Sequence, residues 1–383
     1  MDAMIEELKK VIAICLIRVF NCFPIKSNKI FLYSYYGSQY GCNPKYITEY
    51  ILQNTSKGKF DLVWAFNDIS QFEHLTEIRK VKTMSLRYFY ELCTSKVIIT
   101  NFRTTDLFIK RKNQYYIQTW HSSLRLKQIE KDAEASLPKK YVEMAKKDSE
   151  KCDLLISGCE YSTKIFRRAF WYDGEILESG TPSHDILFSS KKVKYQIYKK
   201  LEIPKKYKTI LYAPTFRKNM DLSVYDLDYS ALCGVLSEKL GGEWMVLIRL
   251  HPHLTNLANQ MNSNKNTKNV TAYSDVQELI ACSDLLVTDY SSVMFSYLLT
   301  KKPCFLYVPD LEEYLSYDRK LYFNIADLPF KSAKTNQELC DNIRDFNNEN
   351  YLLDVERLTA QIRSFETGKA SEVLVKKINK LTG

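Results

Sequence analysis

The stretch DLLVTDYSSVMFSYLLTKKPCFLYVPD, residues 284–310, decides the fold. It holds an apolar strand-like run, a helix-like segment and a second apolar run, which is the pattern of parallel strands joined by a covering helix. Similar strand-like runs are KIFLYSYYG (29–37), FDLVWAFND (60–68), KVIITN (96–101), YYIQTW (115–120), DLLISG (153–158), KTILYAPTF (208–216), WMVLIRLHP (244–252) and VTAYSD (270–275). We therefore predict an α/β protein built on parallel sheets.

The length of the chain and a break in its pattern indicate two domains. A chain of 383 residues is too long for one typical small core, and a Lys-rich segment separates two series of strand-like runs. We place an amphipathic membrane-associating helix at residues 1–23, α/β domains at 24–195 and 196–350, and C-terminal helices that pack back on the first domain at 351–383. Two such domains leave a cleft, and ligands of open parallel sheets collect beyond the carboxyl ends of the strands.

The formal net charge is +10, and lysines gather around the predicted linker. The clustered residues are Lys191, Lys192, Lys194, Lys199, Lys200, Lys205, Lys206 and Lys208. Such a cluster is either a solvated face or a surface for an anionic partner, such as an anionic membrane or a polyanionic product. The chain has no basic-aromatic ribonucleoprotein motif, zinc-finger spacing or helix-turn-helix signature, so nucleic acid is not an expected partner.

Apolar side chains recur at helical spacing in the first 23 residues. The repeating positions are Met4, Leu8, Val11, Ile12, Cys15, Leu16, Val19 and Phe20. The uninterrupted apolar run from Val11 to Ile17 is much shorter than the ~20 residues that span a bilayer, and Glu6 and Glu7 are atypical of a secretory signal. Two interpretations remain: a helix that lies in the membrane interface and a helix that packs on the first domain.

The ten cysteines include no CxxC pair, and several lie in apolar runs where a reduced thiol packs as a small hydrophobe. This pattern indicates a reducing compartment and no disulfide framework. The segment Leu250-His251-Pro252-His253 has HxH spacing but no neighbouring Cys or second His pair. We expect neither a bound metal nor a cofactor.

His121 directly follows the strand-like run YYIQT, in the motif Trp120-His121-Ser122-Ser123. A histidine at a strand end that faces a cleft can take a proton from an attacking hydroxyl, because an unperturbed imidazole titrates near pH ~6.5. The alternative is a histidine that is hydrogen-bonded within its loop.

Two motifs after strand-like runs in the second half suit phosphate groups. Arg249 and His251 fall at the end of WMVLIRLHP, where positive charge can counter a phosphate. Asp289, Ser291 and Ser292 precede a helix-like segment whose free backbone N–H groups, together with two hydroxyls, suit a pyrophosphate. The alternative is ordinary N-capping, for which one such residue is enough.

Two further polar turns follow strand-like runs: Gly180 to Asp185 after EILES, and Ala213 to Arg217, which includes Thr215, after KTILY. Polar turns after successive strands are the arrangement of a cleft enzyme. The chain has no GxGxxG and no Walker GxxxxGK[ST] motif, which argues against a dinucleotide redox enzyme and a P-loop NTPase.

Taken together, the motifs resemble the CDP-glycerol glycerophosphotransferases that prime and polymerise teichoic acids and related capsule polymers. The matching segments are IQTWHSSLRLK (117–127), CEYSTKIFRRAFWYDGEILESGTPSHDIL (159–187), ILYAPTFR (210–217), LIRLHPH (247–253) and ELIACSDLLVTDYSSVMFSYLLTKKPCFLYVPDLEEY (278–314). The resemblance implies two Rossmann-like domains in a GT-B arrangement, an acceptor on the first and a CDP-alcohol on the second. It also implies CMP as a product, no metal at the reacting phosphate and peripheral attachment to the cytoplasmic face of the membrane.

The resemblance also assigns roles to residues. His121 and His251 match the family's two essential histidines, the second beside the donor pyrophosphate, and Ser291 and Ser292 match the serines that hold donor phosphates. Further expected donor ligands are Asp289, Arg249, Thr215 and Arg217, and further expected substrate-binding residues are Lys127, Gly180 and Asp185.

The chain departs from the family pattern at three positions. Ser122 stands where the family reads Gly in TWHGT, Ser183 where it reads Arg in Pro-Arg-Asn-Asp, and Ser296 where it often has Asp. Losing the Arg removes a bidentate anion contact, so the polyol and the acceptor do not follow from the resemblance.

The expected reaction is attack by an acceptor hydroxyl on the donor β-phosphorus, with His121 as base and CMP leaving. The acceptor is a lipid-linked or polymeric polyol-phosphate or glycan. Two alternatives remain: a GT-B glycosyltransferase that uses a nucleotide sugar, and a non-catalytic membrane scaffold of the same fold.

Overall fold

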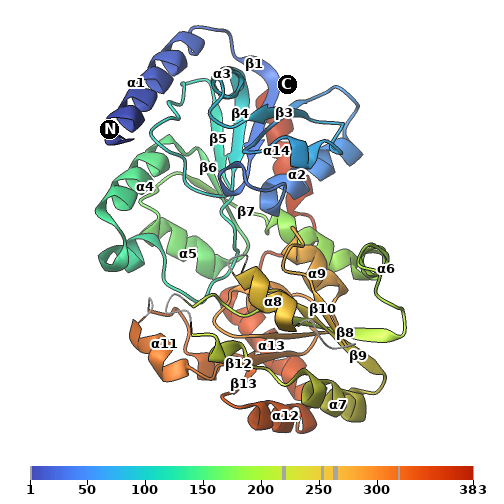
Figure 1. The fold of residues 1–383 in the computed structure, drawn as a ribbon. Helices are drawn as coiled ribbons and strands as arrows, with labels where there is room; N and C mark the ends of the chain where they lie inside the picture. Colours follow the sequence, from blue (N-terminus) through green and yellow to red (C-terminus); the bar gives the residue numbers. More distant parts are fainter. Residues whose placement is uncertain (1, 218–220, 252–253, 262–265, 318–319, 383) are drawn as a thin grey trace. The chain divides into compact units, whose positions relative to one another are not determined.

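The computed structural model describes residues 2–217, 221–251, 254–261, 266–317 and 320–382, which form two compact units. The first unit comprises Met1–Ser123, Ile129–Asp185 and Phe365–Gly383, and the second comprises Leu124–Gln128 and Ile186–Ser364. Each unit is built on one sheet of parallel strands with α-helices packed around it (Figure 1). The predicted α/β class with parallel sheets is therefore confirmed.

The first unit holds a seven-stranded sheet in the order β3-β2-β1-β4-β5-β6-β7. Its strands are β1 (Lys26–Tyr33), β2 (Asp61–Phe66), β3 (Arg79–Lys82), β4 (Ser95–Thr100), β5 (Tyr115–Gln118), β6 (Leu154–Ser157) and β7 (Glu175–Glu178). Its α-helices are α1 (Asp2–Phe20), α2 (Cys42–Asn54), α3 (Leu86–Thr94), α4 (Lys139–Lys151), α5 (Glu160–Ala169) and α14 (Ala370–Thr382). Because β1, β4 and β5 are parallel neighbours, the turns that follow them lie at one edge of the sheet.

The C-terminal helix α14 is part of the first unit, beside α2 (Figure 1). Leu374, Val375 and Ile378 join the core on one side of the first sheet. The carboxylate of Asp185 accepts from the backbone N–H groups of Ala370 at 2.9 Å and Ser371 at 2.8 Å, so it caps the start of this helix.

Helix α1 packs on α3 through one face and leaves other apolar side chains in solvent. Ala13 and Ile17 are buried against Phe89 and Cys93 of α3. The outward side chains are Leu8, Val11, Ile12 and Val19, which are between 50% and 59% exposed. Within the described residues, no helix is long and apolar enough to cross a membrane.

The second unit holds a six-stranded sheet in the order β10-β9-β8-β11-β12-β13. Its strands are β8 (Tyr207–Tyr212), β9 (Glu243–Ile248), β10 (Thr267–Asn269), β11 (Leu285–Thr288), β12 (Cys304–Tyr307) and β13 (Lys331–Ala333). Its α-helices are α6 (Ser190–Lys200), α7 (Tyr229–Leu240), α8 (Thr255–Met261), α9 (Val276–Cys282), α10 (Val293–Leu298), α11 (Leu311–Tyr317), α12 (Asn336–Arg344) and α13 (Asn348–Ile362). The β11-α10-β12 segment is the predicted strand, helix and strand of residues 284–310, although α10 ends at Leu298.

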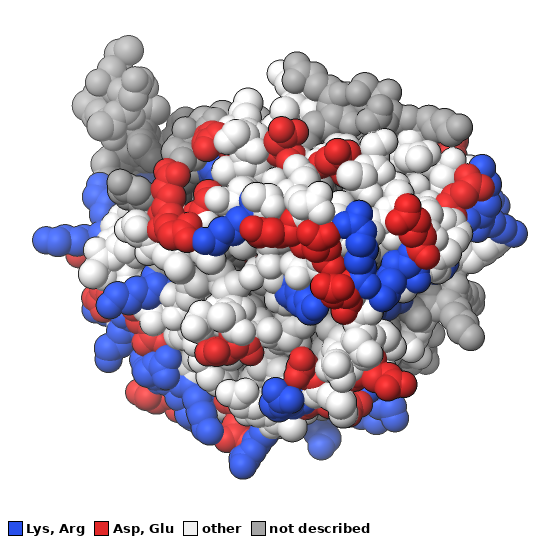
Figure 2. Space-filling model, turned by 90° about the horizontal axis from the view of Figure 1, so that it is seen from below, with Lys and Arg blue, Asp and Glu red and all other residues white. Residues whose placement is uncertain are grey.

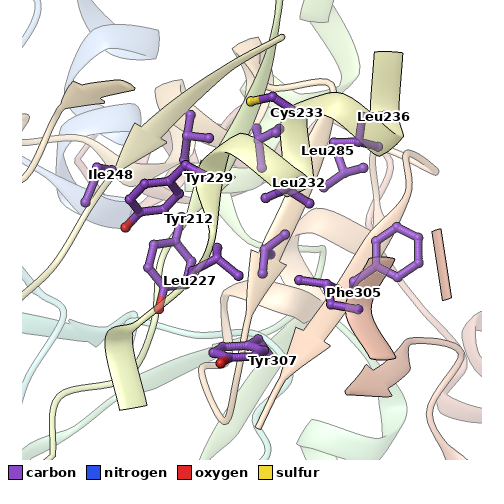
Figure 3. Packing of buried hydrophobic residues seen from close by; sticks show 14 of the residues in the cluster. Tyr212, Leu227, Tyr229, Leu232, Cys233, Leu236, Ile248, Leu285, Phe305 and Tyr307 are labelled. Atoms are coloured by element: carbon purple, nitrogen blue, oxygen red, sulfur yellow. The ribbon is translucent and has the colours of Figure 1, made fainter. Parts of the chain in front are cut away.

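The core of the second unit lies between its sheet and helices α7 and α12. Figure 3 shows Leu232 and Leu236 of α7 close to Leu285 of β11 and Phe305 of β12. All four side chains are at most 1% exposed. This packing fixes the central strands, and so the positions at which their polar turns begin.

The predicted strand VTAYSD (270–275) is wrong. The strand is β10, Thr267–Asn269, and the last ladder bond runs from Val270 N to Ile248 O at 2.8 Å. The chain then turns, with Tyr273 N donating to Val270 O at 3.0 Å. Val270 is 3% exposed, so the start of this segment has the apolar character of a strand although the chain turns there.

The two units also differ from the predicted domain boundaries. The boundary at 195/196 falls inside α6, whereas the units divide between Asp185 and Ile186. Helix α6 belongs to the second unit because it packs on α9 and Lys194 pairs with Asp284 at 2.5 Å. The C-terminal helices are divided, with α13 in the second unit and α14 in the first.

Candidate active site

His121 follows β5 at the carboxyl edge of the first sheet. Its side chain is exposed, and Nδ1 lies 3.4 Å from the carbonyl oxygen of Asn101, which follows the neighbouring strand β4. Because a carbonyl oxygen only accepts, this contact suits the tautomer with its proton on Nδ1. Nε2 is then the ring nitrogen that can accept a proton from a substrate hydroxyl.

Asn101 and Asn43, which the sequence interpretation missed, lie beneath the His121 loop. Asn101 is fully buried, and its Oδ1 accepts from the backbone N–H of Tyr35 at 3.0 Å. Asn43, in the first turn of α2, donates to the carbonyl oxygens of Thr119 and Trp120. Neither asparagine belongs to a recognisable motif, so only the fold brings them to this loop.

The turn from Gly180 to Asp185 is held by contacts to Glu366, which also belongs to the first unit. Glu366 accepts from the backbone N–H of Thr181 at 2.9 Å and from its Oγ1 at 2.7 Å, and it pairs with Nδ1 of His184 at 3.0 Å. Gly180 has a φ of +91°, and a Cβ there would lie 3.0 Å from Glu366 Oε2. The predicted residues Gly180 and Asp185 thus shape this turn and cap α14, which gives each a structural role in the first unit.

Arg217 lies in a buried ionic network of the second unit. Its Nη1 is 2.8 Å from Asp289 Oδ2, and its Nε is 2.6 Å from Asp310 Oδ2. Burial alone would lower the pKa of this guanidinium, but the carboxylates of Asp310 and Asp289 raise the pKa on balance. The charge that the sequence interpretation assigned to donor phosphate is therefore neutralised by two carboxylates in this structure.

Thr215 and Asp289 belong to the same network. The backbone N–H of Thr215 donates to Asp289 at 2.8 Å and its Oγ1 donates at 2.7 Å. Asp289 is 1% exposed and does not cap α10, in contrast to one of the predicted alternatives. The network connects the turn after β8 with the turn after β11, because Thr215 follows β8 and Asp289 follows β11.

Ser291 and Ser292 are partly exposed at the start of α10. Ser292 occupies the N-cap position, and among the described contacts its hydroxyl makes no capping bond. The Ser291 hydroxyl accepts from the backbone N–H of Val293 at 3.4 Å, a long contact. Both residues lie at the carboxyl edge of the second sheet, separated from the buried Asp289 by Tyr290.

His251 and Arg249 follow β9, the neighbour of β8 in the same sheet. The exposed His251 ring packs on Phe216, with ring centroids 4.9 Å apart and planes inclined by 35°. Arg249 is half-buried, and its Nη1 donates to the carbonyl oxygen of Tyr273 at 2.7 Å. The structure thus brings the motifs after β8, β9 and β11 to one edge of the second sheet; His253 lies outside the described residues.

The predicted basic residues contact aromatic rings, carboxylates and carbonyl groups of the protein itself. Lys127 belongs to the second unit, where its Nζ lies 4.9 Å from the centre of the Tyr314 ring. In the Lys-rich segment, Lys206 pairs with Glu243 at 2.8 Å and Lys208 donates to the carbonyl oxygen of Leu240 at 2.7 Å. Figure 2 shows Lys and Arg interspersed with Asp and Glu over the face that it displays.

Over the part of the chain that the structure describes, no three His, Cys, Asp or Glu side chains gather as metal ligands. Parallel sheets with polar turns at the carboxyl ends of their strands are the arrangement typical of a nucleotide-binding α/β enzyme, and this is the class of protein that the fold indicates. Its candidate groups are a histidine on the first unit and two serines, a histidine and an arginine on the second.

Comparison with known proteins identifies the family. The family model described as CDP-Glycerol:Poly(glycerophosphate) glycerophosphotransferase matches residues 15–380. The teichoic acid poly(glycerol phosphate) polymerase of Bacillus spizizenii is 30% identical over 373 residues, which cover 94% of each chain. That of Bacillus subtilis is 31% identical over 93% of this chain, which spans 49% of the relative's length. A solved structure of the wall teichoic acid polymerase TagF superposes with a TM-score of 0.84 at 28% identity, covering 99% of this chain and 96% of that one.

The chain belongs to the CDP-glycerol:poly(glycerophosphate) glycerophosphotransferase family and is a glycerophosphotransferase. The resemblance that the sequence motifs indicate is confirmed.

Proposed function

We propose that the chain transfers glycerol phosphate from CDP-glycerol to a hydroxyl group of a teichoic-acid-type acceptor, polymeric or lipid-linked, and releases CMP. The observation that carries the proposal is the placement of His121 at the carboxyl edge of the first sheet, where Nδ1 lies 3.4 Å from Asn101 O. This contact suits the tautomer with its proton on Nδ1, in which Nε2 is the ring nitrogen that can accept a proton. The names of the relatives support the choice of glycerol phosphate.

In the proposed mechanism, the acceptor hydroxyl attacks the β-phosphorus of CDP-glycerol. His121 Nε2 takes the hydroxyl proton as the new P–O bond forms, and the bond to the bridging oxygen breaks to release CMP. His251, Arg249 and the hydroxyls of Ser291 and Ser292 stabilise the negative charge on the pyrophosphate. All four of these residues keep solvent-exposed surface at the edge of the second sheet.

Arg217, Thr215 and Asp289 act one step further from the donor in this proposal. Their largely buried network holds the turns after β8 and β11 in place, and Ser291 lies two residues after Asp289. They therefore position the donor site through the backbone, a different role from the direct phosphate contact that the sequence predicts. Lys127 also belongs to the second unit, where it contacts the Tyr314 ring.

The proposal includes the GT-B arrangement, in which the first domain receives the acceptor and the second the donor. It also places the protein at the cytoplasmic face of the membrane, in the synthesis of teichoic acid or a related capsule polymer. Support for attachment to an anionic membrane surface comes from α1, whose outward apolar side chains Leu8, Ile12 and Val19 stand beside the exposed Lys10 and Arg18.

The test is a donor screen with a short, soluble glycerol phosphate oligomer as acceptor. CDP-glycerol should give CMP and a longer oligomer. His121→Ala should lower the rate of elongation by roughly 10²–10⁴, the usual cost of removing a positioned base, and should leave CDP-glycerol affinity within about twofold because the donor is assigned to the second unit. His74, which is exposed in the first unit, provides the matched control, and His74→Ala should elongate at the wild-type rate.

Other results of the screen would change the proposed donor or the proposed base. Release of CMP from CDP-ribitol in preference to CDP-glycerol would replace the polyol in the proposal. Release of UDP or GDP from a nucleotide sugar would favour a glycosyltransferase. A folded His121→Ala protein that elongates normally would end the assignment of the base.

A further inference from the structure

Asn43 is buried beneath the loop that carries His121, and its side-chain amide is bonded at both ends. It is 0% exposed. Nδ2 donates to Thr119 O at 3.2 Å and to Trp120 O at 3.0 Å, and Oδ1 accepts from the backbone N–H of Ser183 at 3.0 Å. Two carbonyl acceptors on one side and an N–H donor on the other fix the orientation of the amide.

Trp120, the residue before His121, has a left-handed backbone with a φ of +51°. A bulky residue adopts this conformation only where its surroundings hold it. The backbone N–H of Trp120 donates to Oε1 of the buried Gln118 at 2.9 Å. Its carbonyl oxygen accepts from Asn43 Nδ2 at 3.0 Å and from Thr119 Oγ1 at 3.1 Å. Both polar groups of the Trp120 backbone are thus bonded to buried side-chain amides.

The carbonyl that Asn43 holds belongs to the peptide unit that joins Trp120 to His121. Because a peptide unit is planar, fixing its oxygen fixes the direction in which the chain enters His121. The other end of the same amide holds Ser183 in the turn between Gly180 and Asp185. A single side chain therefore connects two polar turns of the first unit.

We infer that Asn43 is a positioning residue, which directs the imidazole of His121 by holding the backbone of Trp120. The inference rests on the proposed role of His121 as base. Asn43 touches neither donor nor acceptor in this account, so its removal should lower the rate of transfer and leave donor affinity unchanged. Displacement of a catalytic group by about 1 Å can cost about 10²-fold in rate.

The test is Asn43→Asp, which keeps the size of the side chain and the acceptor for Ser183 N but replaces two N–H donors by an oxygen facing two carbonyls. With CDP-glycerol and a short glycerol phosphate oligomer, kcat should fall about 10²-fold. The affinity for CDP-glycerol, measured by calorimetry, should stay within twofold. In a His121→Ala background the same change should reduce the residual rate no further, because the two residues act as one unit.

The matched control is Thr48→Val on the same helix. Thr48 is also 0% exposed, and its hydroxyl donates to Pro44 O and accepts from Trp64 Nε1, both at 2.9 Å, away from the His121 loop. This variant should have a lower Tm and a wild-type kcat. If it loses kcat as strongly as Asn43→Asp does, a general loss of stability explains both and the inference is wrong.

The remaining outcomes separate this inference from the proposed function. Normal transfer by His121→Ala removes the base assignment. Loss of transfer by His121→Ala together with a wild-type kcat for Asn43→Asp overturns only the positioning role. Asn43→Ala, which introduces no charge, replaces the Asp variant if the latter does not fold; failure of both to fold would show that Asn43 serves the fold and would contradict the inference.

Discussion

Burial separates the residues at the edge of the second sheet into two groups. Arg217 and Asp289 are 5% and 1% exposed and satisfy each other, whereas Ser291 and His251 keep surface that a ligand can reach. Sequence motifs name all four, but a motif does not reveal which charges are already paired. We therefore expect the first group to govern stability and the second to govern donor affinity.

Replacing Arg217 tests the first half of this division. Arg217→Met would leave the buried Asp289 and the partly buried Asp310 without their common partner, which should lower the free energy of unfolding by about 3–5 kcal/mol. Urea denaturation measures the change. Lys301, which forms an exposed pair with Glu356, is the control, and Lys301→Met should cost no more than ~1 kcal/mol. Unchanged stability with lost donor affinity would restore the direct phosphate contact.

Removing the two hydroxyls at the start of α10 tests the second half. Ser291→Ala combined with Ser292→Ala should weaken CDP-glycerol binding by about 1–3 kcal/mol, the range for hydrogen bonds to a charged group. Calorimetric titration measures the affinity, and Ser237→Ala on α7, whose hydroxyl bonds Cys233 O, is the matched control. A folded double variant with wild-type affinity would remove these serines from the donor site.

At the level of elements, α1 shows that the two interpretations of the N-terminal pattern are compatible. Ala13 and Ile17 pack on α3, while Leu8, Ile12 and Val19 point away from it. Deleting the helix would therefore also uncover Phe89 and Cys93. Substituting the outward side chains is the more specific experiment.

Leu8→Gln, Ile12→Gln and Val19→Gln together should reduce co-sedimentation with anionic liposomes, because the apolar surface available for insertion is lost. Turnover on a short soluble acceptor should stay at the wild-type level, since the substituted side chains lie outside the α3 contact. The control is Leu353→Gln, which changes a 60% exposed apolar residue on α13. Equal sedimentation of the wild type and the triple variant would contradict a membrane role for this face.

The sequence predicts the central elements well because their apolar runs are continuous. The central strands β4 (SKVIIT) and β11 (LLVT) each contain three consecutive apolar residues, whereas the edge strands β3 (RKVK) and β13 (KSA) have no such run and are not predicted. The pairing of Glu366 with His184 joins residues 182 positions apart in the chain. Contacts of this kind follow from the order of the strands and the return of α14, neither of which local patterns specify.

At the level of the whole molecule, the two units should respond differently to the donor alone. A ligand that binds the folded state stabilises the unit that holds it, by ~2.7 kcal/mol at a free concentration one hundred times the Kd. Because the proposed donor groups all belong to the second unit, CDP-glycerol should slow amide hydrogen exchange there first. The expected segments are 249–251 and 288–293.

Hydrogen exchange monitored by mass spectrometry, with and without CDP-glycerol, can detect this difference. Exchange in residues 119–123, the loop of His121 in the first unit, should stay unchanged with the donor and slow when an acceptor oligomer is added. Helix α12, which packs in the core of the second unit away from the polar turns, is the internal reference. Because free CMP shares the cytidine and one phosphate with the donor, it should reproduce part of the protection in the second unit. Protection by CDP-glycerol that appears in residues 119–123 and not in 288–293 would reverse the assignment of donor and acceptor to the two units.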